Sequence, residues 1–254
     1  RTQPVYADAP SPGFGSGNLQ ETGVVAEKKK AVGVSSATVT SATYSFSFEL
    51  FSENTIIDLS DNNPSDSGTG WTYEDNVYTI LNGAYLTVTG DNANQRRIEV
   101  AANATATITL NNVTINGLGD NQSPLLLNSG ADVTLILADG TSNTLVAGSG
   151  RAGIQVPAGT KLTIDGTGSL TATGSYNGAG IGGGALSDSG SIIIDGGTVT
   201  AQGGLYGAGI GGGWNGRGSV IINGGTVTAT GGNNGAGIGS GYCNLETGKD
   251  AGSI

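Results

Sequence analysis

Apolar and polar residues alternate in short runs along most of the chain, and glycine-rich turns separate these runs. The block Gly-Ala-Gly-Ile-Gly occurs three times, and its isoleucines, Ile181, Ile210 and Ile238, are separated by 29 and 28 residues. A fixed period of about 20 to 50 residues is typical of a solenoid. The pattern therefore predicts a stack of equivalent turns.

Each turn of this stack contains three short strands, and each strand has inward positions that should form ladders along the stack. For the first strand we assign the ladder Leu86, Val113, Leu145, Leu170, Val199 and Val227. For the second strand we assign the pairs Ile108/Leu110, Leu135/Leu137, Leu162/Ile164, Ile192/Ile194 and Val220/Ile222. For the third strand we assign Ile98, Leu125, Ile154, Ile181, Ile210 and Ile238. Three stacked strands per turn of about 27–29 residues predict an all-β parallel β-helix.

The first 70 residues differ in pattern from the repeats. Residues 1–41 contain prolines, glycines and few apolar residues, which predicts an extended arm. Residues 42–70 should cap the solenoid with a strand and an acidic loop, and residues 71–254 should form the β-helix. Strict alternation predicts a half-buried strand, and its apolar face comprises Ala42, Tyr44, Phe46, Phe48 and Leu50.

The runs Gly-Ala-Gly-Ile-Gly-Gly-Gly and Gly-Gly-Thr-Val-Thr-Ala resemble those of repeat-bearing surface proteins of Gram-positive bacteria. These proteins belong to the right-handed parallel β-helices that bacteria secrete. The resemblance covers roughly residues 71–254 and implies a right-handed β-helix outside the cell or on its surface. It also implies a link to carbohydrate, because some similar proteins bind acidic plant polysaccharide.

The charge of the chain excludes some partners. Ten basic and twenty acidic residues give a net charge of −10, which opposes binding to nucleic acid or to anionic membranes. No apolar run reaches the roughly 18 residues of a membrane-spanning helix. The chain has no histidine and a single cysteine, so a nucleophilic dyad is unsupported and we predict no enzymatic activity.

Aromatic residues mark a candidate site for carbohydrate. Trp214 and Tyr242 lie four residues after a block isoleucine, at the place of Ala185, and open the loops that follow. Together with Tyr176 and Tyr206 they could offer ring faces to sugars, and Arg217 could bind a carboxylate. The alternative is that these aromatic side chains only attach their loops to the stack.

Two further sets of polar residues recur in register. Asp165, Asp195 and Asn223 follow the second strand in successive turns, where they could bind calcium or simply cap their own turns. No cofactor is otherwise required.

The second set comprises Ser169, Thr171, Thr198, Thr200, Thr226 and Thr228, and its spacing resembles the threonine faces of ice-binding solenoids. Val146 interrupts this array, which spans three turns. Ice binding is therefore, with polysaccharide cleavage, the least supported function.

The ends of the stack favour self-assembly. Gly252-Ser253-Ile254 aligns with Gly190-Ser191-Ile192 at the start of a strand, which predicts a solenoid open at its C-terminal end. The strand at 42–50 or the arm could add to that edge in a neighbouring copy and produce a head-to-tail filament. The sequence thus favours a structural, self-assembling extracellular protein, with a carbohydrate-binding surface module as the alternative.

Overall fold

The structure is a computed structural model that describes residues 38–40, 43–45, 55–92 and 95–243 of the 254-residue chain. The chain divides into two units, residues 1–51 and 52–254. In the first unit, β1 (Thr38–Thr40) and β2 (Thr43–Ser45) form an antiparallel pair in which Tyr44 lies opposite Val39. Ala42, Phe46, Phe48 and Leu50 of the expected assembly strand lie outside the described residues.

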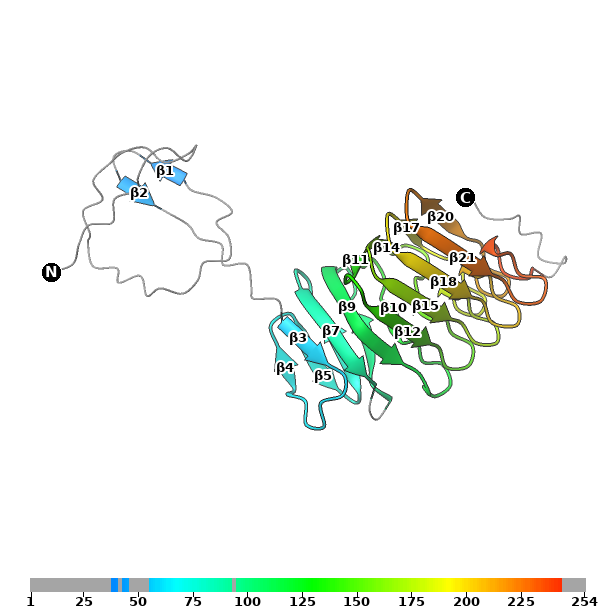
Figure 1. Cartoon of the computed structure of the whole chain (residues 1–254), viewed down its shortest axis with the longest axis horizontal. Helices are drawn as coiled ribbons and strands as arrows, with labels where there is room; N and C mark the ends of the chain where they lie inside the picture. Colours follow the sequence, from blue (N-terminus) through cyan, green and yellow to red (C-terminus); the bar gives the residue numbers. More distant parts are fainter. Residues whose placement is uncertain (1–37, 41–42, 46–54, 93–94, 244–254) are drawn as a thin grey trace. The chain divides into compact units, whose positions relative to one another are not determined.

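The second unit is an all-β parallel solenoid of about seven turns, as predicted, and its described residues contain no α-helix (Figure 1). The right-handed sense stays a prediction. Parallel pairing begins with β3 (Thr55–Asp58) on β7 (Tyr85–Asp91), within the segment that the sequence assigns to the cap. None of the described residues forms a helix long and apolar enough to cross a membrane.

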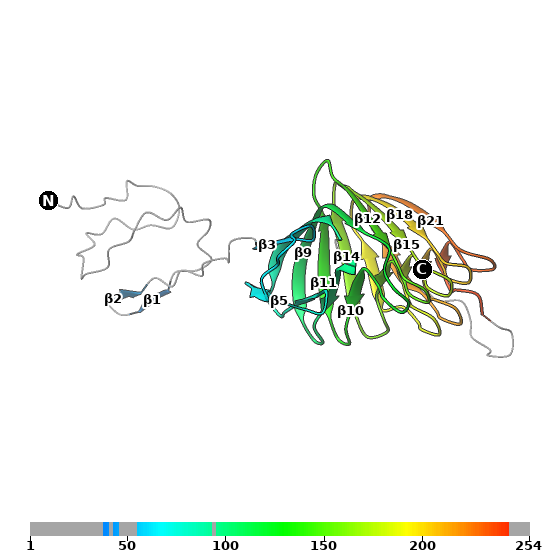
Figure 2. The ribbon, with the colours of Figure 1, turned by 90° about the horizontal axis from the view of Figure 1, so that it is seen from below.

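Three walls form the solenoid, and Figure 2 shows them from a second direction. Wall A contains β3, β7, the first part of β9 (Thr105–Ile115), β11 (Asp132–Leu137), β14 (Lys161–Gly166), β17 (Ser191–Ile194) and β20 (Ser219–Ile222). Wall B contains the last part of β9, β12 (Ser142–Val146), β15 (Ser169–Thr173), β18 (Thr198–Gln202) and β21 (Thr226–Thr230). Wall C contains β4 (Ser67–Gly68), β5 (Trp71–Glu74), β6 (Val77–Ile80), β8 (Arg97–Val100), β10 (Leu125–Leu127), β13 (Ile154–Gln155), β16 (Ile181–Gly182), β19 (Ile210–Gly211) and β22 (Ile238–Gly239).

The ladder of wall C is confirmed at every predicted position. Its residues pair in parallel from Ile98 through Leu125, Ile154, Ile181 and Ile210 to Ile238. Tyr78 adds one more position at the N-terminal end. All of these side chains except the half-buried Ile238 are shielded from solvent, so wall C contributes a continuous column to the core.

The predicted registers of walls A and B are wrong by two residues in places. The error at Leu86 is larger, because Leu86 pairs with Ile108 in wall A and the partner of Val113 is Gly90, four residues later. In wall B, Leu145 pairs with Ala172, and the residue opposite Leu170 is Asn143. In wall A, Leu162 pairs with Val133, whereas Leu135 pairs with Ile164. A shift of two residues keeps each side chain on the same face of the sheet, so these apolar residues are buried even though their partners differ.

Asn143 is the reason why the register of wall B is hard to find. It occupies a ladder position that apolar residues fill in the following turns, and it is only 2% exposed. Its Oδ1 accepts the N–H of Val113 (2.9 Å), and its Nδ2 donates to the carbonyl oxygen of Ser169 (3.0 Å). The amide thus joins three successive turns with buried hydrogen bonds, which compensate for its desolvation.

Replacing Asn143 with leucine is expected to destabilise the solenoid by about 2–3 kcal/mol, because both hydrogen bonds are lost in the core. The control is Thr144→Leu, which introduces the same side chain at the next position of β12, on the outer face. Chemical denaturation should show a change below about 0.5 kcal/mol for this control. An Asn143→Leu protein as stable as the wild type would contradict the role given to the amide.

An antiparallel hairpin closes the core at the N-terminal end of wall C. β5 and β6 pair through a turn at Asp75 and Asn76, which both have positive φ, and Trp71 and Tyr78 pack edge to face. Burial raises the pKa of Tyr78 to about 12. Hydrogen bonds from the buried side chain of Arg96 join this hairpin to the segment that follows β3.

Arg96, which the sequence did not single out, lies beside this hairpin and is 2% exposed. Its Nη1 donates to the carbonyl oxygen of Leu59 (2.7 Å), and its Nε donates to the hydroxyl of Tyr73 (3.1 Å). The guanidinium group also lies over the Tyr73 ring. Asp58 nearby has a lowered pKa, mainly because the hydroxyl and the backbone N–H of Ser60 donate to its carboxylate.

Candidate functional site

Two tight turns flank each glycine block, one before and one after the short strand of wall C. The turns before the block span 175–178, 204–207 and 232–235, and each closes with a backbone hydrogen bond between its first and fourth residues. The turns after the block span 184–187 and 213–216, and Gly241 and Tyr242 align with the first two residues of these turns. Cross-turn bonds within the block, such as Ala179 N–H to Gly183 O, bring the two kinds of turn together.

Hydrogen bonds also join each turn after a block to the turn before the block one coil earlier. The N–H of Ala185 donates to Gly150 O (3.1 Å), that of Trp214 to Asn177 O (2.8 Å), and that of Tyr242 to Tyr206 O (2.8 Å). Ala185, Trp214 and Tyr242 therefore occupy equivalent backbone positions, as the sequence alignment proposed. The turns form a single ridge that runs along the solenoid.

Three tyrosine rings follow one another along this ridge. The ring centroids of Tyr176 and Tyr206 are 5.8 Å apart with planes at 85°, and those of Tyr206 and Tyr242 are 5.5 Å apart with planes at 37°. Tyr176 is 55% exposed, whereas Tyr206 and Tyr242 are half-buried. The rings form a ladder across three successive coils, and the angles show that this ladder is not a flat platform.

Two leucines that the sequence analysis missed extend the apolar surface of these turns. Leu186 is 63% exposed and Leu205 is 37% exposed. Leu205 lies at the place that Tyr176 has one coil earlier, and Leu186 accompanies Trp214 because its N–H donates to Trp214 O (2.8 Å). We call this surface the aromatic ridge, which consists of Tyr176, Leu186, Leu205, Tyr206, Trp214 and Tyr242.

Backbone strain accompanies the exposed side chains of the ridge. Tyr176 has a φ of 44° and Leu186 a φ of 59°, in the left-handed region that bulky residues rarely adopt. Asn215, at the place of Leu186 one coil later, has a φ of 56° and is a residue type that tolerates this conformation. Such strain is common at functional sites, where surrounding structure holds it.

A buried acceptor lies between the turns of Tyr176 and Trp214. Among the described residues, the Oδ1 of Asn177 is shielded from solvent and has no hydrogen-bond donor. The carbonyl oxygen of the same residue accepts the N–H of Trp214. Buried polar atoms without a partner are uncommon, and this one lies inside the ridge.

Arg217, the predicted carboxylate-binding residue, is exposed and lies just after the turn of Trp214. Its backbone N–H donates to Oδ1 of Asp188 (2.8 Å), and its carbonyl oxygen accepts the N–H of Ser189 (2.8 Å). The structure thus holds the backbone of Arg217 in place beside the ridge.

The expected calcium ligands Asp165, Asp195 and Asn223 lie at the ends of β14, β17 and β20 on the exposed surface. Asp165 Oδ1 accepts the N–H of Gly166 (2.7 Å), and Asn223 Nδ2 donates to Asp195 Oδ1 (2.7 Å). Oxygen atoms that could bind calcium therefore already accept hydrogen bonds within their own turn or from the next coil. In the described part of the chain, no group of three or more His, Cys, Asp or Glu residues is placed to hold a metal ion.

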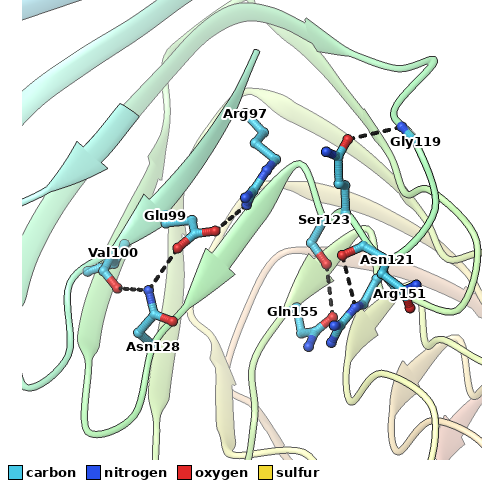
Figure 3. Close-up of polar contacts among 10 residues, drawn as sticks. Arg97, Glu99, Val100, Gly119, Asn121, Ser123, Asn128, Arg151 and Gln155 are labelled. Carbon is cyan, nitrogen blue, oxygen red and sulfur yellow. Dashed lines mark hydrogen bonds and ion pairs between the residues drawn. The ribbon is translucent and has the colours of Figure 1, made fainter. Parts of the chain in front are cut away.

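Polar side chains contact one another along wall C and the turns next to it (Figure 3). Ser123 donates to Gln155 Oε1 (2.9 Å), and Arg151 donates to the carbonyl oxygen of Asn121 (3.2 Å). On the neighbouring strands, Glu99 pairs with Arg97 and accepts from Asn128. Among these contacts, the one between Arg151 and Asn121 holds the turn at 148–151, to which the N–H of Ala185 is hydrogen-bonded.

A separate hollow of ≈560 Å³ opens at the N-terminal hairpin. Its lining comprises Asp66, Thr72, Tyr73, Glu74 and Asp75. The hollow lies on β5 and its flanking turns and shares no residue with the aromatic ridge.

Comparison with known proteins gives one match. A family model described as "Carbohydrate-binding domain-containing protein" matches residues 74–249, which is more than half of the chain and includes the whole aromatic ridge. No curated protein matches the chain, and no solved structure does so.

Proposed function

Because the chain belongs to the family of carbohydrate-binding domain-containing proteins, we propose that it binds a polysaccharide chain along the aromatic ridge. The observation that carries this proposal is the ladder of Tyr176, Tyr206 and Tyr242 across three coils. Parallel strands are stacked about 4.8 Å apart, which is similar to the length of one sugar ring in an extended glycan. A glycan parallel to the solenoid axis would therefore meet one coil per sugar.

The chemistry of the ridge suits sugars, which have both apolar C–H surfaces and hydroxyl groups. Tyrosine and tryptophan combine an apolar ring with a polar group that donates or accepts hydrogen bonds. Leu186 and Leu205 add exposed apolar surface, which is uncommon in tight turns and indicates a contact surface. The strained backbone at Tyr176 and Leu186 supports the same conclusion, because it keeps two bulky side chains at the crest of the turns.

The ridge has no charged member, so its main contacts would serve neutral surfaces of sugar rings. The net charge of the whole chain, −10, repels a negatively charged polysaccharide. Arg217 beside the ridge would favour an acidic sugar, and calcium held near Asp165, Asp195 and Asn223 would offset the repulsion. We propose binding without catalysis, since the family description names binding alone.

The test is a pull-down on insoluble cellulose and affinity electrophoresis in xylan or polygalacturonate, with calcium and with chelator. Tyr176→Ala should weaken binding about tenfold or more, the equivalent of about 1.4 kcal/mol, because an exposed ring contact is lost. The matched control is Tyr85→Ala, since Tyr85 is also 55% exposed but lies on wall A. Equal binding by wild type and Tyr176→Ala would remove the ridge as the site.

Self-assembly into a filament, which the sequence favours, stays a prediction. Most of the arm at 1–41 and most of the strand at 42–50 lie outside the described residues. Electron microscopy of the purified chain is the appropriate test, and monodisperse particles with the arm intact would contradict assembly. An extracellular or cell-surface location likewise stays a prediction.

A further inference from the structure

The outer face of wall B carries a regular array of hydroxyl groups. Parallel pairing of β12, β15, β18 and β21 places their outward residues in three columns of four. The first column is Ser142, Ser169, Thr198 and Thr226; the second is Thr144, Thr171, Thr200 and Thr228; the third is Val146, Thr173, Gln202 and Thr230. All but Val146 and Gln202 are serine or threonine. We call these twelve residues the hydroxyl face.

The observed register removes both objections that the sequence raised against this array. Val146 lies in the third column, opposite Thr173, and interrupts neither of the first two. Ser142 and Thr144 enter those columns, so the array spans four coils instead of three. Thr114 of β9 extends the second column by one further coil.

The geometry of the hydroxyl face is repetitive in two directions. Coils are about 4.8 Å apart, and outward residues of one strand are about 6.8 Å apart. On the inner side of the same strands, Ala172, Ala201 and Ala229 form one column. β15, β18 and β21 therefore have the same side chain at this core position. Threonine has a stiff χ1 angle, which keeps its hydroxyl and methyl groups in fixed positions.

The hydroxyl face is also uncharged, although the chain has a net charge of −10. By contrast, the outer side of wall A carries Asp132, Lys161, Asp165 and Asp195. Most residues of the hydroxyl face are exposed, and the others are half-buried. A neutral and periodic surface is complementary to a partner that is itself neutral and periodic.

We propose that the hydroxyl face binds the surface of an ice crystal. A hydroxyl group both donates and accepts hydrogen bonds, as water does, so a fixed lattice of hydroxyls can hold a lattice of ordered waters. The neighbouring threonine methyl groups leave these waters free to bond to one another. A crystalline polysaccharide is the other neutral and periodic partner, but the face has no aromatic side chain, whereas carbohydrate contacts depend on such surfaces.

The test measures ice recrystallisation and the shape of single ice crystals in solutions of the whole chain. Wild-type protein should slow recrystallisation and produce faceted crystals. Thr200→Lys, at the centre of the face, should need about tenfold more protein for the same effect. The matched control is Thr134→Lys, the same change at an outward position of β11 on wall A, and it should behave as wild type.

Several outcomes would overturn this proposal. One is a wild-type protein that leaves ice growth unchanged, and another is a Thr200→Lys protein with full activity. A third outcome combines two results: the wild type leaves ice growth unchanged, and Thr200→Lys abolishes binding to crystalline cellulose. The hydroxyl face would then bind glycan and not ice. Circular dichroism and melting curves of both lysine variants establish that folding is unaffected. The proposal is independent of polysaccharide binding at the aromatic ridge, which Tyr176→Ala tests separately.

Discussion

Gly182→Ala is expected to destabilise the solenoid by about 3–5 kcal/mol, more than any exposed substitution. Gly182 has a φ of 137°, in a region that side chains rarely adopt. A Cβ at this position would overlap with the carbonyl oxygen of Gly211 in the next coil. Backbone atoms cannot move aside as a side chain can, so the turns on both sides of the block would separate. Urea denaturation followed by circular dichroism measures the loss.

Gly159→Ala is the matched control for this prediction. Gly159 also has a positive φ, of 81°, but the space around its would-be Cβ is open. Its replacement should cost about 1–2 kcal/mol, the strain of the backbone conformation alone. Equal losses of stability for the two variants would contradict this prediction. They would show that glycine is needed at position 182 only for its positive φ, and that close packing between coils contributes little.

Affinity for oligosaccharides is expected to rise about 30-fold between one and three sugars and then to level off. Each aromatic contact contributes about 1 kcal/mol beyond the burial of its surface, and two further contacts amount to a factor of about 30. The plateau follows from the length of the tyrosine ladder, which spans three coils. Calorimetric titration with cello-oligosaccharides and with oligogalacturonates, each from one to six units, measures this dependence. A monosaccharide that binds as tightly as the hexamer would contradict a site extended along the ridge.

The wall C column from Ile98 to Ile238 could be predicted from the sequence, whereas its first position, Tyr78, was missed. Ile181, Ile210 and Ile238 are each enclosed by the same glycines, which fixes three positions, and the earlier positions follow from their spacing to this block. The glycines also determine the turns, because the coils approach too closely there for side chains. The positions of the glycines in the sequence thus agree with the close approach of the coils in the structure, which is why the fold could be predicted.

The registers of walls A and B could not be predicted in the same way. Alternation of apolar and polar residues identifies the face of a strand, but a shift of two residues preserves that face. At Asn143 the ladder contains a polar residue whose hydrogen bonds to Val113 and Ser169 are visible only in the structure. An aliphatic pattern therefore selects Leu145 instead and misplaces the hydroxyl face by one column.

The candidate site was partly predictable, because Trp214 and the three tyrosines stand out in repeats that are otherwise uniform. The sequence did not reveal that Tyr242 contacts the Tyr206 ring, since the two residues lie on different sides of the glycine block. Leu186 and Leu205 were missed because an aliphatic residue in a short segment bounded by glycines resembles a core position. Their exposure depends on turn geometry, including the positive φ of Leu186.

The position of a bound glycan tests the proposed function most directly. A crystal structure of the chain with the tetrasaccharide that binds best should show sugar rings along the aromatic ridge, parallel to the solenoid axis, with about one sugar per coil. Contacts should include the ladder of Tyr176, Tyr206 and Tyr242. A glycan bound across the coils, on the hydroxyl face or at the N-terminal hollow would contradict the account.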